Sequence, residues 1–167
     1  MSNASRFQFI KSQHVPTLTV LHAAIEDFSY DRHAHEEYAF GVTLAGRQDF
    51  FSGGRFHRSS PGNVILFNPE QVHDGEPGGE HALDYLMVYV HPEQVNAQFA
   101  EVLGHEKMAS FRSDSTLIQD AQLRSAILEL ARLVTSHAGS CIDQENALYQ
   151  VIERTVQLGG VSQPNQV

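Results

Sequence analysis

Short apolar segments separated by turn residues fill the first half of the chain. The segments are rich in Val, Ile, Phe, Tyr and Thr. Turn residues follow about every eight to twelve positions, which is typical of an antiparallel β-sandwich or β-barrel. The pattern predicts strands over residues 18–25, 38–45, 47–51, 64–67 and 83–90. Glycine and proline supply the breaks between them, with Gly53-Gly54 as an expected hairpin turn.

Helical spacing replaces the strand pattern after Pro92, a residue that suits a first helical turn. A helix over residues 93–103 should end at the glycine that follows it. A longer helix is expected to begin at a cap on Ser113 or Asp114 and to run to about residue 137. A third helix should begin at a cap on Asp143 and end at the next pair of glycines.

The longer helix is apolar over more than one face. Its apolar surface extends beyond a single stripe, which favours burial against both the barrel and a partner chain; the additional residues are Ile118, Leu123, Leu130 and Leu133. Packing within one chain is the alternative explanation of the same pattern.

These elements divide the chain into a barrel over residues 5–92, a helical segment over 93–160 and a flexible polar tail over 161–167. Residues 1–4 look like a remnant of tag removal and are set aside. A chain of 167 residues is the length of one domain with an appended helical element.

Charge and cysteine content narrow the possible functions. Eleven Lys and Arg against twenty Asp and Glu give a formal charge of −9, so this segment should repel nucleic acid. The single cysteine, Cys141, excludes an internal disulfide. Neither a membrane-spanning stretch nor a signal peptide is visible, and we therefore expect a cytoplasmic protein.

The first candidate site is His33-Ala34-His35, at the start of the strand expected near residue 38. Alternate residues of an extended chain share a face, so both histidines should lie on one side with Glu37. Small residues continue that face along the strand, beginning at Ala39. Convergent polar groups beside open space are what a ligand site requires.

The second candidate is the segment from Pro61-Gly62 to His73. A turn leads into an apolar strand, and the strand leads into a loop that begins with Asn68-Pro69 and presents His73.

The ordered set of these motifs resembles the two cupin motifs. It is more closely similar to the N-terminal effector-binding domain of AraC-type transcriptional regulators. In that family a histidine-rich first strand precedes a glycine, which corresponds to Gly46 here. A Pro-Gly turn then opens a strand that ends in Asn-Pro-x-x-Val-His, as in residues 61–73. The match covers roughly residues 7–90, and the helices that follow also fit the family.

The resemblance implies a cupin-like antiparallel β-barrel, or jelly-roll, followed by two or three α-helices. It also implies a ligand-sensing domain that forms a homodimer through its C-terminal helices. Such regulators bind DNA through helix-turn-helix motifs in a C-terminal domain that this chain lacks. We therefore expect an isolated sensor fragment that does not bind DNA or membranes.

Metal binding is left open by the same comparison. Typical metal-binding cupins carry a glutamate four residues after the second histidine, where this chain has Ala39. His33, His35 and His73 could still hold Zn, Fe or Ni. They could equally serve as hydrogen-bonding groups for a polar ligand, with no cofactor required.

The expected effector is a small polar metabolite, sugar-like or amino-acid-like. Carboxylates at Glu37 and Asp74 suit hydroxyl or amine groups, and Tyr85 or Tyr89 could add phenols. An anionic effector would need Arg32 or Arg47.

Two other functions compete with the sensor. A metal-dependent cupin enzyme, a dioxygenase or isomerase, would use His33, His35 and His73. A barrel that serves only dimerisation would need no polar interior face.

Overall fold

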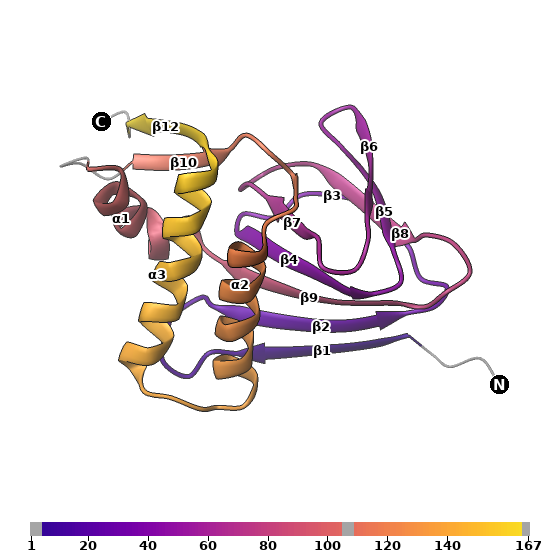
Figure 1. Ribbon diagram of the computed structural model, residues 1–167, viewed down its shortest axis with the longest axis horizontal. Coiled ribbons are helices and arrows are strands. Elements are labelled where there is room, and N and C mark those ends of the chain that lie inside the picture. The colour runs from indigo at the N-terminus through magenta and orange to yellow at the C-terminus, as the bar shows by residue number, and fades with distance from the viewer. Residues whose placement is uncertain (1–4, 105–108, 165–167) are drawn as a thin grey trace.

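The computed structural model describes residues 5–104 and 109–164, and shows two facing β-sheets with three helices packed on the outer side of the larger one (Figure 1). The larger sheet has the order β1 (Arg6–Lys11), β2 (Thr19–Ile25), β9 (Leu83–Val90), β4 (Tyr38–Ala45), β7 (Val64–Phe67) and β11 (Leu117–Ile118). The smaller sheet has the order β3 (Tyr30–His33), β8 (His73–Pro77), β5 (Gln48–Ser52) and β6 (Arg55–Ser59). All strand pairs are antiparallel, so the predicted fold class is confirmed.

Two further strands and the helices complete the chain. They are α1 (Pro92–Leu103), β10 (Ala109–Ser113), α2 (Ala121–Thr135), α3 (Cys141–Leu158) and β12 (Gly160–Pro164). Residues 161–164 of the expected flexible tail lie in β12, which pairs with β10. Residues 165–167 and the expected tag remnant over 1–4 lie outside the described part of the chain. Within that part, no helix is long and apolar enough to cross a membrane.

The side chains of β4 alternate between two cores, as its sequence predicts. Tyr38 and Phe40 lie in the core under the helices, whereas Ala39 lies in the core between the two sheets. The space expected beside the small residues is filled, however. A Cβ atom at Gly41 would lie 2.8 Å from the Met87 sulfur, so Met87 occupies the room that the glycine leaves.

The strand pattern does not extend back from β4 to the histidines. Residues 34–37 form a bend between β3 and β4, and β3 belongs to the smaller sheet. His33 and His35 therefore do not share a continuous strand face with Ala39, in contrast to the prediction.

Two helix starts differ from those predicted. The cap of α2 is Asp120, whose side chain accepts a hydrogen bond from the Leu123 N–H, and not Ser113 or Asp114. Leu117 and Ile118 pair with the edge of β7 instead, because completing the sheet satisfies backbone groups that a helix would leave unpaired there. The cap of α3 is Ser140 in a capping box, with Asp143 as its third helical residue.

Both apolar faces of α2 are used within one chain. Leu123 and Ile127 are fully buried in the core that the helices share with the outer face of the larger sheet, and Leu133 is 8% exposed in the same core. Figure 1 shows α2 and α3 side by side against that sheet. The apolar pattern is therefore explained by packing within the chain, and a homodimer stays a prediction.

Asp120 contributes both a cap and an ion pair. Its carboxylate receives two hydrogen bonds from the Arg154 guanidinium, at 2.8 and 2.9 Å. We expect Asp120→Ala to lower the free energy of unfolding by about 1–2 kcal/mol, and Asp120→Asn to lower it less because asparagine also caps helices. Urea unfolding of the three proteins measures both effects. Equal stability of the alanine variant and the wild type would contradict this role.

The stabilisation by the Asp120 charge should depend on pH. The pKa of Asp120 is lowered from its ordinary value of 3.8, chiefly by the hydrogen bonds from Arg154. A lowered folded-state pKa stabilises the protein above the ordinary value, and the effect disappears as pH falls through the folded-state pKa. The stability difference between wild type and Asp120→Asn should therefore shrink below about pH 4. A constant difference from pH 7 to pH 3 would exclude the charge as its cause.

Candidate functional site

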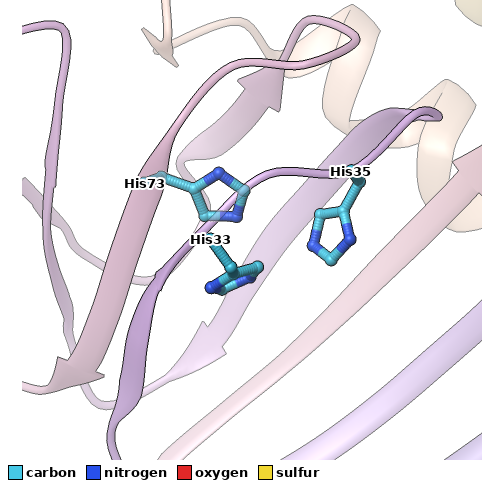
Figure 2. A group of neighbouring side chains, drawn as sticks. All are labelled: His33, His35 and His73. Carbon is cyan, nitrogen blue, oxygen red and sulfur yellow. The ribbon is translucent and has the colours of Figure 1, made fainter.

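Three histidines from three segments meet beside the core between the sheets. His33 ends β3, His35 lies in the bend before β4, and His73 begins β8, where it pairs with His33. Their imidazole nitrogens offer one atom each within 4.8 Å of one another. Figure 2 shows the three rings grouped around a common space. We call these three residues the histidine site.

Backbone carbonyls fix the orientation of two of the rings. Nδ1 of His33 lies 2.5 Å from the Asp31 carbonyl oxygen, and Nδ1 of His73 lies 2.9 Å from the Gln71 carbonyl oxygen. A carbonyl oxygen only accepts, so each Nδ1 carries the proton and donates it. Nε2 of both rings then keeps its lone pair for a ligand. Metal-binding histidines commonly have this arrangement.

Burial favours the neutral form of His73 and His35. His73 is buried and stacks on Phe67, with ring centroids 3.6 Å apart. Desolvation lowers the pKa of His73 to about 4, although its hydrogen bond to Gln71 acts in the opposite direction. Desolvation also lowers the pKa of His35. The electrostatic interaction with His33 acts in the same direction, and the Glu37 carboxylate acts against it.

Tyrosine hydroxyl groups line the neighbouring part of the interior. Tyr85 donates a hydrogen bond to the Tyr30 hydroxyl at 2.9 Å, and Tyr89 meets His35 edge to face at a centroid distance of 5.3 Å. Burial raises the pKa of all three phenols, so they stay protonated and can donate hydrogen bonds. Tyr85 lies beside the site, and its hydroxyl proton is already donated to Tyr30.

The two predicted carboxylates, Glu37 and Asp74, have different surroundings. Glu37 is half-buried and close enough to affect the pKa values of His35 and Tyr89. Among the described residues, however, the group that could hold a metal consists of the three histidines alone. Asp74 points to the outer face of the smaller sheet, where it accepts a hydrogen bond from the Phe51 N–H at 2.6 Å. Its position beside His73 on a strand explains this, because adjacent side chains face opposite ways.

The two arginines also lie away from the histidine site. Arg32 lines a cavity of about 270 Å³ on the outer face, together with Asp74. Arg47 binds the carboxylate of Asp49 through two hydrogen bonds. A larger cavity, of about 840 Å³, also lies outside the barrel and includes the His22–Asp84 pair.

Sequence reasoning missed Tyr30 and Gln48. Tyr30 lies three positions before His33, and a shift in register between them brings its ring within 5.8 Å of the histidine ring. Simple alternation gives no signal for such a contact. Gln48 is 5% exposed, and its Oε1 has no hydrogen-bond partner among the described residues. A polar side chain at an inward position of a strand is a sign of a ligand site, and Gln48 could have been found in this way.

The fold and the site define a ligand-binding β-barrel domain. Residues 15–152 match the AraC-like ligand binding domain, and the chain belongs to this family. The predicted resemblance is thereby confirmed. The family comprises ligand-binding domains of regulators, which agrees with the predicted sensor and not with the alternative of an enzyme.

A curated relative points to the same class. The chain is 24% identical over 124 residues to a protein described as the uncharacterized HTH-type transcriptional regulator YbfI of Bacillus subtilis (strain 168). The match covers 74% of this chain and 44% of that protein, so the chain spans less than half the length of this relative.

Solved structures with a similar fold include cupin domains. One is a Cupin 2 conserved barrel domain protein from Salinispora arenicola CNS-205, with a TM-score of 0.46 and 16% identity, covering 56% of this chain and 79% of that one. Another is the cupin domain of an XRE family transcriptional regulator from Enterobacter cloacae, with a TM-score of 0.46 and 9% identity, covering 54% and 99%.

Proposed function

We propose that this chain is the sensing part of a transcriptional regulator and that a small metabolite binds at the histidine site. The observation that carries the proposal is the free Nε2 of His33 and His73, held in place by the bonds that each Nδ1 donates. Neutral imidazoles can accept a hydrogen bond from a hydroxyl or amine group, as in a sugar-like or amino-acid-like effector.

The polar groups around the histidines support recognition of such an effector. The Glu37 carboxylate is an acceptor, and the Tyr89 phenol is a donor because its pKa is raised by burial. A ligand there would replace water around half-buried side chains, which strengthens each hydrogen bond.

The remaining parts of the proposal concern the whole regulator. This segment carries a formal charge of −9 and should repel DNA. DNA binding would therefore be the role of a helix-turn-helix domain in the parent protein. The parent would then act in the cytoplasm as a homodimer joined through its C-terminal helices. Analytical ultracentrifugation at micromolar concentration tests the dimer, and a monomer at every concentration would exclude it for this segment.

Effector binding should appear as thermal stabilisation. A ligand present at about a hundred times its dissociation constant adds about 2.7 kcal/mol, which raises Tm by roughly 5–10 °C for a chain of this size. We would screen sugars and amino acids by thermal shift, with His35→Ala as the test variant and His22→Ala as the control. His35 belongs to the site, whereas His22 is exposed and pairs with Asp84. Stabilisation of His35→Ala as large as that of His22→Ala and the wild type would place the ligand elsewhere.

A divalent metal is a second candidate for the same three nitrogens. Three imidazoles, two of them with Nδ1 bound to a carbonyl oxygen, are a donor set that Zn, Fe or Ni accepts, with positions left open for an effector. When bound, the metal would supply a Lewis acid for an oxygen or nitrogen of the effector, and His33, His35 and His73 would hold it. Ala39 stands where typical cupin metal sites have a carboxylate. The three imidazoles would therefore bind the metal without adding negative charge.

A further inference from the structure

A row of aromatic rings connects the protein surface to the histidine site. Phe7 on β1 contacts Phe28 at a centroid distance of 5.3 Å, and Phe28 contacts Tyr30 at 5.0 Å. Tyr30 contacts His33 at 5.8 Å, and His33 contacts His73 at 4.4 Å. We call Phe7, Phe28 and Tyr30 the aromatic shelf. The shelf and the histidine site are thus one continuous surface of rings.

The outer part of the shelf is exposed to solvent. Phe7 is 39% exposed and Phe28 is 43% exposed. Phe7 pairs with Ala23, which lies in the core between the sheets, so its ring is on the inner side of the larger sheet. β1 is the edge strand, and its inward side chains are therefore incompletely covered. Exposed aromatic rings that adjoin a polar site are typical of a binding surface.

The deeper interior offers little room for the body of a ligand. Met87 lies against Gly41, and Phe50, Phe67 and Tyr85 fill the same core. An effector that reaches the histidines must therefore extend outward, and the rings of the shelf lie next to them. Half-buried Tyr30 joins the two regions, since its ring touches both Phe28 and His33.

We propose that the effector joins one polar group, held at the histidine site, to an aromatic or alkyl body that packs on the aromatic shelf. This inference rests on the proposed function and narrows its ligand class. It favours a molecule with an amine or hydroxyl head, such as an amino-acid-like or amino-alcohol-like compound, and an apolar side chain over a sugar. Packing of an aromatic body on rings also provides specificity, because offset and edge-to-face contacts have preferred geometries.

A matched pair of probes separates the two parts of the site. Phenylalaninol carries an amine and a hydroxyl on an aromatic body, and alaninol carries the same head without the ring. Glucose represents the sugars. Each is titrated to low millimolar concentration into the wild type, Phe28→Ala and Phe51→Ala, with NMR shifts of aromatic and imidazole groups as the readout. Phe51 is a suitable control because its ring is 51% exposed and contacts Phe56 on the β5–β6 hairpin.

The expected result is tighter binding of phenylalaninol than of alaninol or glucose, with shifts at Phe28, Tyr30 and His33. Phe28→Ala should weaken it about three- to tenfold, as loss of one aromatic contact implies, and Phe51→Ala should not. Equal binding of alaninol and phenylalaninol at the histidines would overturn the shelf but leave the histidine site intact. Shifts at the shelf without any at the histidines would overturn both the joined ligand and the proposed effector site.

Pairing of two chains through the β1 edge is the competing use of Phe7 and Phe28. Sedimentation of wild type and Phe28→Ala detects it in the same samples. A dimer that the variant converts to a monomer would overturn the shelf as a ligand surface.

Discussion

Replacement of His73 with alanine is expected to lower the affinity for zinc at least about a hundredfold. The variant removes one of three donors, and even changes in groups that only orient a ligand cost ten- to a hundredfold in affinity. His73 is also the most buried of the three, at 6% exposed, and its Nδ1 is fixed by the Gln71 carbonyl. Competition with a chromophoric chelator, on protein purified without a metal-affinity column, measures the change.

Two further variants make the zinc result interpretable. His73→Ala also removes a ring that stacks on Phe67, so His35→Ala, in a half-buried bend, serves as a second site variant with less effect on packing. His22→Ala is the control, because it removes an exposed histidine that pairs with Asp84 outside the site. Zinc affinity that is equal in all four proteins would exclude a metal at the histidine site and leave hydrogen bonding as its role.

The strands with strong apolar patterns could be predicted from the sequence to the residue. β4, β7 and β9 are sandwiched between the helices and the smaller sheet, so burial on both faces gives long apolar segments. β3 and β8 could not be found in this way. Their sequences, YDRH and HDGEP, are mostly polar, and pairing with neighbouring strands in the smaller sheet defines them.

The meeting of the three histidines was predictable from motif order, whereas their exact surroundings were not. His33 and His73 pair across two strands that local sequence does not reveal. The irregular register before His33 brings Tyr30 into the site, and the bend after it breaks the expected face with Ala39. The outward position of Asp74 could have been predicted from alternation with His73.

The Asn68-Pro69 motif has a structural role that its sequence does not disclose. The Asn68 amide donates to the Ser113 carbonyl at 3.1 Å, and its oxygen accepts from the Ser113 N–H at 2.8 Å. Gln71 adds a further hydrogen bond, which its side-chain amide donates to the Thr116 hydroxyl at 2.9 Å. The loop that presents His73 is thereby attached to the segment that leads into β11 and α2.

Asn68→Ala is therefore expected to lower the free energy of unfolding by about 2–4 kcal/mol. The alanine leaves two backbone groups of half-buried Ser113 without their Asn68 partners, and an unsatisfied group costs about 1–3 kcal/mol when it is fully buried. Asn68→Asp should lie between, since one oxygen still accepts from the Ser113 N–H while the other faces a carbonyl oxygen. Urea unfolding measures the series, with Asn146→Ala on the exposed face of α3 expected to stay within about 0.5 kcal/mol of wild type. If Asn68→Ala were as stable as this control, the tie between the loop and the helices would contribute nothing to the fold.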